Sequence, residues 1–394
     1  MKKFVLALIC ILMFSGMHGI SESACIFTLI NPSATDVALG LDSGTANIWN
    51  TSPLSVWSNP AKLGYHTGFA YGYSHDPWLE DSPWIDFDMY HQSSYISYGW
   101  NGIGILLPAP SAKNRWGTVM NYGEQEQTDE FGNVIGTFES YDACSKFALG
   151  INSLEFISNF ITNENIRSLQ YYRDLSIGFN YDIIHSDLAT QGAGATPDSL
   201  SFIADAHSTG IGLIGRISPF NKMNALGGFC TLDITGGIYY LNPSKEEITY
   251  INDSDPLPWG THSAFSGKFS LGLNIIQELD NENVRFFINN LFSIYYSQDN
   301  AQYGEKDEFN PSVWGEGIEY TFLDIFSIRK GQYVDREGEI VGDTKGYGLN
   351  LHYKDIIQFQ YNKVTFPGGG LQYEQEKTDY LVKIDFLKAY ELFR

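Results

Sequence analysis

The chain has 394 residues, a formal net charge of −22 and an aromatic content of 15%. An acidic chain without a basic stripe cannot release counterions from phosphates, so nucleic acid is excluded as a partner. Beyond the N-terminal segment, no stretch offers the ~20 consecutive apolar residues of a membrane helix, which excludes a helical membrane protein. Abundant Tyr, Phe, Trp and Gly suit a β-protein, either a membrane barrel or a large secreted protein.

Residues 1–23 have the form of a secretory signal peptide. Lys2 and Lys3 give a positive start, an unbroken apolar run covers residues 4–14, and small residues follow up to Ser23. We therefore expect cleavage after Ser23 and export of the mature chain from the cytoplasm.

Residues 24–64 form the second predicted part, an N-terminal hatch that plugs the lumen of a barrel. The stretch 40–64 does not alternate between apolar and polar residues, and it is too rich in Gly, Ser and Pro for a stable helix along its length. Pro60 fixes its own φ and biases Asn59 away from the α region, while the Asn59 side chain can hold a turn. The segment is thus ordered but neither strand nor long helix.

Residues 65–394 form the third part, in which apolar and polar residues alternate with the period of a β-strand. For example, Leu175, Ile177 and Phe179 share one face, whereas Asp174 and Ser176 share the other. We expect fourteen strands, near residues 65–74, 93–107, 115–122, 139–150, 170–182, 206–217, 226–241, 262–277, 284–298, 313–322, 325–333, 344–353, 356–366 and 377–387.

Loop lengths separate a barrel from a soluble sandwich, which would show the same alternation. The expected connections alternate between long and mostly short, as in an outer-membrane barrel with long loops at one end. Acidic residues gather in the long loops, including Asp76 in the expected loop 75–92. They are either solvated loop residues or a rim that attracts divalent cations or a cationic partner. Their spacing defines no metal site.

Several charged residues occupy the inward face if the alternation is right. We expect them to pair with one another and with the backbone of the plug, because a filled lumen has no bulk water for each charge. A gating role for one or two is the alternative. These residues are Lys146, Asp174, Asp182, Arg216 and Lys268.

Catalytic signatures are absent from the sequence. There is no GxSxG elbow and no HExxH motif, and the short Gly-rich runs do not follow a phosphate-binding pattern. We therefore expect no enzyme activity, no cofactor and no metal.

The segment before the first strand resembles the FadL/PorV superfamily of outer-membrane barrels. The resemblance rests on Gly40, Gly44, Trp57 and the motif Asn59, Pro60, Ala61, which continues as Lys-Leu-Gly. The Asn-Pro-Ala-Lys-Leu form is most similar to the PorV/PorQ branch of type IX secretion, and the fatty-acid-channel branch shares Asn-Pro-Ala. The family implies a fourteen-stranded antiparallel barrel with an N-terminal hatch in the lumen.

This resemblance implies an integral protein of the bacterial outer membrane, in contact with its lipid, with two alternative functions. A PorV-like component would receive secreted cargo by its C-terminal signal domains and would contact the translocon. A FadL-like channel would admit long-chain fatty acids or other small hydrophobic compounds. A structural barrel without transport is a third possibility. We expect the secretion component first and the channel second.

Overall fold

The structure is a computed structural model, and it describes most of the chain after the expected signal peptide. The described residues are 26–40, 43–78, 89–128, 131, 133–160, 173–189, 201–223, 229–243, 247–248, 257–258, 266–281, 284–300, 313–323, 325–335, 340–353, 356–367 and 374–393.

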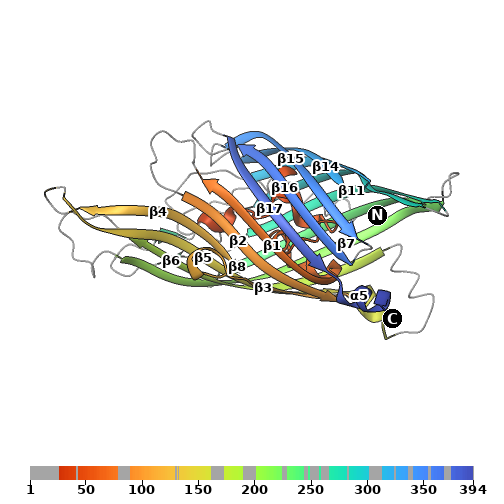
Figure 1. Cartoon of the computed structure of the whole chain (residues 1–394), viewed down its shortest axis with the longest axis horizontal. Helices are drawn as coiled ribbons and strands as arrows, with labels where there is room; N and C mark the ends of the chain where they lie inside the picture. The colour runs from red at the N-terminus through yellow and green to blue at the C-terminus, as the bar shows by residue number, and fades with distance from the viewer. Residues whose placement is uncertain are drawn as a thin grey trace, which may run out of the picture.

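Fifteen strands form one antiparallel sheet, and this sheet closes on itself because β1 pairs with both β2 and β17. The strands are β1 (Gly68–Trp78), β2 (Met89–Trp100), β3 (Ile103–Pro108), β4 (Thr118–Thr128), β5 (Val134–Asn152), β6 (Arg173–Ala189), β7 (Ser201–Met223), β8 (Phe229–Pro243), β11 (Ser266–Asn281), β12 (Val284–Asn300), β13 (Val313–Phe322), β14 (Phe326–Asp335), β15 (Ile340–Tyr353), β16 (Ile357–Pro367) and β17 (Glu374–Ile384). They occupy fourteen positions, because β3 and β4 follow each other between β2 and β5. The predicted fourteen-stranded barrel is confirmed (Figure 1).

The two faces of the barrel wall have opposite polarity. In β6 the outward Phe179 is 50% exposed, whereas the inward neighbours Asn180 and Asp182 are 6% and 3% exposed. Apolar residues outside and polar residues inside is the reverse of a water-soluble protein, and a closed barrel leaves no strand edge unpaired in lipid. The chain is therefore an integral outer-membrane barrel.

Among the described residues, no helix is long and apolar enough to cross a membrane.

The expected strand 93–107 is wrong, because the structure divides it into a hairpin. Asn101 and Gly102 form the turn between β2 and β3, with φ of 50° and 77°. An Asn-Gly pair accepts two consecutive positive φ angles, as a tight hairpin requires. The expected strand 115–122 corresponds to β4, which shares one position in the wall with β3. Dividing the first expected strand adds one strand, and placing β3 and β4 at one position removes one, so the predicted number of wall positions is right.

A short α-helix, α3 (Ser153–Ser158), lies in the expected connection 151–169.

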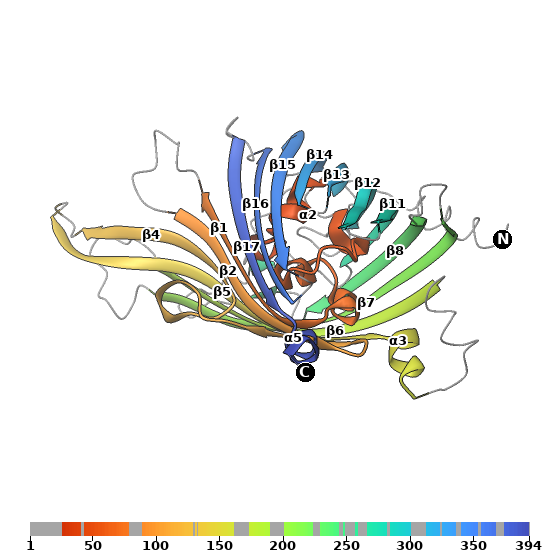
Figure 2. The same cartoon turned by 45° about the vertical axis from the view of Figure 1, so that its right-hand side comes forward.

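The N-terminal segment (residues 26–40 and 43–66) lies inside the ring of strands (Figure 2). It consists of short pieces: η1 (Ile26–Leu29), α2 (Ala34–Ala38), η2 (Ser43–Ala46), η3 (Pro53–Trp57) and η4 (Pro60–Tyr65). Four of them contact successive sectors of the wall. η3 contacts β1 and β2, and η4 contacts β2, β3 and β5 to β7. η2 contacts β7 to β13, and α2 contacts β14 to β17. That this segment acts as a plug stays a prediction.

Glycines in the inner wall seat the N-terminal segment. A Cβ on Gly178 in β6 would lie 2.2 Å from the carbonyl carbon of Pro60 and 2.2 Å from the nitrogen of Ala61. Both are backbone atoms, which cannot rotate away. The close approach of η4 to the wall therefore requires glycine at this position.

Replacing Gly178 with Ala should lower the free energy of unfolding by roughly 1–3 kcal/mol, the usual cost of overpacking. The matched control is Gly215→Ala in β7, where an added Cβ would have no atom within 4 Å. Urea titration of the folded barrel, read by its electrophoretic mobility, measures both. Equal midpoints for the two variants would contradict the proposed seat.

Candidate functional site: the N-terminal segment and the lumen

The carboxylate of Asp36 in α2 connects the separate pieces of the N-terminal segment. Its Oδ2 accepts a hydrogen bond from Ser58 Oγ at 2.9 Å and lies 3.2 Å from Lys62 Nζ. Its Oδ1 accepts from Asn50 Nδ2 at 3.1 Å. Asp36 and Lys62 are 0% and 1% exposed. An ion pair without water must satisfy its remaining bonds within the protein, and these neighbours do so.

A second buried ion pair ties the segment to the closure of the barrel. Lys377 Nζ of β17 lies 3.3 Å from Asp76 Oδ2 of β1, and both side chains are 0% exposed. The same Nζ donates to the carbonyl oxygen of Asn31 at 2.6 Å. The backbone N–H of Ala34 donates to Asp379 at 2.7 Å. Asp76, which we expected in a solvated loop, instead lies in a strand and faces the lumen.

The predicted motif residues lie against the inner wall. Asn59 caps η4 by accepting a hydrogen bond from the nitrogen of Ala61, and its Nδ2 donates to the carbonyl oxygens of Leu213 and Ile238. Pro60 begins η4, as the missing N–H and fixed φ of proline favour. The oxygen of Ala61 accepts from Ser176 Oγ at 2.6 Å. The motif is therefore brought together with β6, β7 and β8.

The other expected residues of the segment lie farther round the lumen. Gly40 has a φ of 100°, and a Cβ on it would meet the backbone of Glu316 at 2.7 Å. Gly44 lies in η2. Trp57 ends η3, and its indole N–H donates to the oxygen of Thr28 at 3.2 Å.

The predicted lumen charges divide into two clusters. Lys146 Nζ lies 3.0 Å from Asp182 Oδ2 and 4.7 Å from the centre of the Trp57 ring. In the other cluster, Asp174 Oδ2 forms an ion pair with Arg216 Nε at 2.8 Å, and Asp174 Oδ1 accepts a hydrogen bond from the hydroxyl of Tyr65 at 2.5 Å.

Two further points concern these charges. Lys268 lies in β11 opposite Tyr239, and its side chain is outside the described residues. Sequence reasoning missed Asp233, whose Oδ2 lies 3.8 Å from Arg216 Nη1. Its inward position follows from the alternation of β8, so this signal was present in the sequence.

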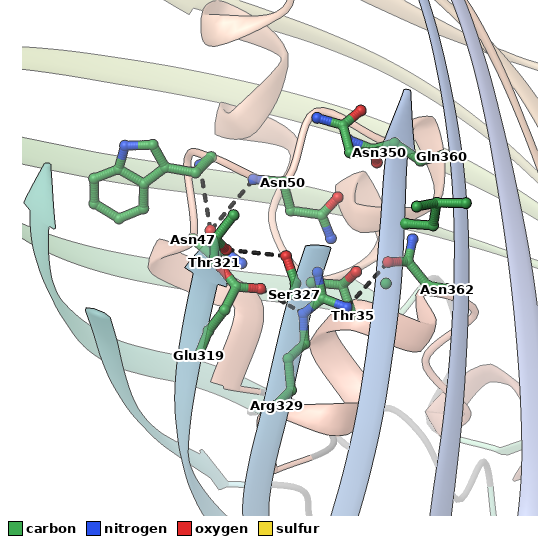
Figure 3. A pocket seen from close by; sticks show the side chains of 13 residues that line it. Thr35, Asn47, Asn50, Glu319, Thr321, Ser327, Arg329, Asn350, Gln360 and Asn362 are labelled. Atoms are coloured by element: carbon green, nitrogen blue, oxygen red, sulfur yellow. Dashed lines mark hydrogen bonds and ion pairs between the residues drawn. The ribbon is translucent and has the colours of Figure 1, made fainter. Parts of the chain in front are cut away.

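A small polar pocket lies between the N-terminal segment and strands β13 to β16 (Figure 3). Its volume is about 60 Å³, room for a few water molecules. Arg329 on its wall pairs with Glu319 and donates to Asn362 at 3.0 Å, while the hydroxyls of Thr321 and Ser327 lie 2.9 Å apart. Paired charges and hydroxyls favour water here and disfavour a hydrocarbon.

The opposite side of the lumen carries an apolar cluster, with the Lys146–Asp182 pair beside it. One continuous cluster joins the N-terminal segment to the inner faces of β2 to β7. Its larger members are Phe27, Leu54, Val56, Trp57, Leu63, Tyr95, Leu106, Met120 and Ile184. The lumen thus holds a polar pocket toward β13 to β16 and an apolar cluster toward β2 to β7, with the N-terminal segment between them.

The apolar cluster reaches a gap in the wall between β3 and β4. Leu106 is opposite Ala148 of β5, and the next pair along β5 is Thr118 with Cys144. Residues 145–147 of β5 therefore have no opposite residue in the described part of β3 and β4. On the other side the ladder to β2 continues, because Ser94 bonds to both Ala109 and Gly117.

Tyr95 of β2 closes this gap from inside the lumen. Its side chain is 1% exposed. Its hydroxyl lies 3.1 Å from the carbonyl oxygen of Cys144 and 3.1 Å from Thr118 Oγ1, and it also bonds to the backbone of Lys146. One side chain thereby satisfies backbone groups of β5 that a strand would otherwise pair.

The residues between β3 and β4 form a flap (residues 109–117) on the outer wall. The guanidinium of Arg115 lies 3.3 Å from the centre of the Tyr141 ring, and both Arg115 and Lys113 pair with Glu139. Gly117 has a φ of 85°, which returns the chain to the wall. Beneath the flap, Val119 is 0% exposed although it points outward.

His66 lies between η4 and β1 and is buried. Burial lowers its pKa from 6.5 to about 3, and the positive charges of Lys383 and Lys62 add to the effect. His66 is therefore neutral in the folded protein, and its Nδ1 lies 3.1 Å from Ser97 Oγ.

Because the folded-state pKa of His66 is the lower one, the unfolded chain takes up the proton first as the pH falls. The stability due to neutral His66 is present above pH 6.5 and is lost progressively toward pH 3. Between pH 7 and pH 5 this loss amounts to about 2 kcal/mol. His66→Gln, which cannot titrate, should reduce the pH dependence of the free energy of unfolding by that amount. Identical slopes for both proteins would contradict it.

Removing either partner of the Asp36–Lys62 pair should cost roughly 3–5 kcal/mol, because the other charge remains buried without a counter-ion. Asp36→Asn and Lys62→Met test this, and the double variant should cost less than the sum of the two. The control is Lys330→Met, which breaks a pair on the outer face whose partners are 68% and 51% exposed, with an expected change of at most ~1 kcal/mol. Urea unfolding of all four variants provides the comparison, and strict additivity would contradict the coupling.

The chain matches no family model and no curated protein. Among solved structures, it is similar to the toluene transporter TbuX of Ralstonia pickettii, with 10% identity, a TM-score of 0.37, and coverage of 91% of this chain and 100% of the other. The toluene transporter TodX of P. putida has 11% identity, a TM-score of 0.39 and coverage of 90% and 99%. Outer membrane phospholipase A from Escherichia coli has 10% identity, a TM-score of 0.29 and coverage of 81% and 93%.

Proposed function

We propose that this barrel is an outer-membrane channel that admits small hydrophobic compounds, of the class of long-chain fatty acids or hydrocarbons. The observation that carries this proposal is the apolar cluster that runs from the N-terminal segment to the gap in the wall between β3 and β4. A compound that reaches this gap can leave the lumen sideways into lipid and need not enter water.

The position of the apolar cluster in the lumen gives this route its direction. On the β13 to β16 side, Arg329 pairs with Glu319 and donates to Asn362. A hydrocarbon in this pocket would displace water from these polar groups and offer no hydrogen bond in return, which is unfavourable. On the β2 to β7 side, Met120 and Ile184 offer apolar surface, which a hydrophobic compound contacts without that penalty.

Two elements must move for transport along this route. Phe27 and Trp57 occupy the apolar side, so a compound has to displace part of the N-terminal segment. The hydroxyl of Tyr95 must also leave Cys144 and Thr118. Each of these hydrogen bonds contributes roughly 0.5–1.5 kcal/mol, so the closure is reversible at modest cost.

The native Cys144 allows the gap to be locked. Thr118 is directly opposite Cys144, so Thr118→Cys places a second thiol across the β4–β5 ladder at the edge of the gap. Oxidation should abolish uptake of a fluorescent long-chain fatty acid or an aromatic hydrocarbon into proteoliposomes, and reduction should restore it. Tyr95→Phe, which keeps the ring but removes the hydroxyl, should increase uptake by roughly 3–10-fold.

The reduced Thr118→Cys protein is the matched control for the cross-link, and Tyr98→Phe on the outer face is the control for Tyr95→Phe. Unchanged uptake by the oxidised Thr118→Cys protein would refute exit through the gap.

A role in type IX secretion, with cargo signal domains and a translocon as partners, is the second proposal. It rests on the form of the motif at residues 59–64. In the structure, Asn59 and Ala61 bond to the inner wall and so hold the N-terminal segment in place. A secretion component and a channel would both need that contact, so the motif does not favour secretion. We therefore place the channel first.

A further inference from the structure

The chain does not end with its last strand. β17 stops at Ile384, three residues before the expected end of the strand, and a helix, α5 (Phe386–Phe393), follows outside the barrel (Figure 2). Asp385 starts this helix firmly. Its carboxylate accepts from the backbone nitrogens of Leu387 and Lys388 at 3.1 Å, and its own N–H donates to the oxygen of Ile356 at 2.8 Å.

α5 has an exposed apolar side. Phe386 and Tyr390, four positions apart on one side of the helix, are 58% and 65% exposed, and Leu387 is 54% exposed. Lys388 and Glu391 lie on the other side, three positions apart. An apolar side of this size facing water is unfavourable by roughly 25 cal/mol for each Å² exposed.

The apolar side of α5 continues the lipid-facing surface of the barrel. The ring of Phe386 lies 6.5 Å from that of Phe69, and Phe69 shares the outward face of β1 with Tyr73. A groove of about 270 Å³ lies between α5 and the end of β2. Its lining is mixed: Tyr98 and Trp100, which are 43% and 50% exposed on the outward face, face the charged Lys388 and Glu391 of α5.

This end of the barrel faces the periplasm. β1 begins here, β17 ends here, and the tight turn between β2 and β3 lies beside the groove. Short turns mark the periplasmic end of outer-membrane barrels, and aromatic residues gather where the apolar band meets the headgroups. A short amphipathic helix at that level lies in the plane of the interface.

We infer that α5 is an interfacial helix that binds the periplasmic, phospholipid leaflet of the outer membrane. Phe386, Leu387 and Tyr390 enter the acyl region. Lys388 and Glu391 face the headgroups and water. This inference is independent of the proposed transport route.

Nitroxide labels on the two sides of α5 test this inference in the full mature chain, folded into phospholipid bilayers. The labelled variants, in a background with Ser at positions 25, 144 and 230, are Phe386→Cys, Tyr390→Cys, Lys388→Cys and Glu391→Cys. Collisions with oxygen, which dissolves in lipid, should exceed those with a water-soluble nickel chelate severalfold at positions 386 and 390. The ratio should reverse at positions 388 and 391.

Equal access of the nickel chelate to all four labels would place α5 in water and overturn the inference. Protection of position 390 from both reagents, together with a doubled particle mass, would show that a second copy covers the helix, which also overturns it. A second measurement does not depend on labelling. The double variant Phe386→Ser, Tyr390→Ser should insert into phospholipid vesicles severalfold less efficiently than Lys388→Ser, Glu391→Ser, and equal insertion would again refute lipid binding.

Discussion

The order of the lumen depends on one buried carboxylate. The N-terminal segment has no helix or strand long enough to hold itself together, yet it contacts almost the whole inner wall. Asp36 solves this by joining Asn50, Ser58 and Lys62, which come from different parts of the segment. Because the Asp36–Lys62 pair is buried away from water, removing either partner leaves an uncompensated charge and lowers the free energy of unfolding. The segment is therefore built like the polar core of a small domain.

The N-terminal segment separates two sides of the lumen that differ in polarity, and the functional proposal rests on this difference. The side toward β13 to β16 keeps its charges paired around a pocket for water. The side toward β2 to β7 carries an apolar cluster that reaches the gap, where Tyr95 takes the place of missing strand pairs. A barrel wall in lipid must satisfy its backbone groups, so a gap of this kind needs a side chain to close it. Because the hydroxyl of Tyr95 closes the gap, breaking its hydrogen bonds opens the gap without unpairing a strand.

The sequence predicts the barrel well because a two-residue period is a local property. It predicts the ends of strands and the partners of single side chains less well. The hairpin at Asn101 and Gly102 was missed because the alternation of Tyr98 and Trp100 continues into β3, although the Asn-Gly pair signals a turn. Lys146 and Asp182 were expected to point inward, and register alone brings them together. Asp36 and Lys62 are 26 residues apart on irregular backbone, so no spacing rule links them.

The pair between Asp76 and Lys377 has a consequence for how the barrel is completed. β1 and β17 share seven residue pairs, and they join parts of the chain about 300 residues apart, whereas β6 and β7 share seventeen local pairs. Joining distant parts of a chain costs more entropy and comes late in assembly. Lys377 holds β1 and the oxygen of Asn31 together, so the last ladder to form is fastened from inside by the N-terminal segment. The N-terminal segment thus helps to hold closed the barrel that encloses it.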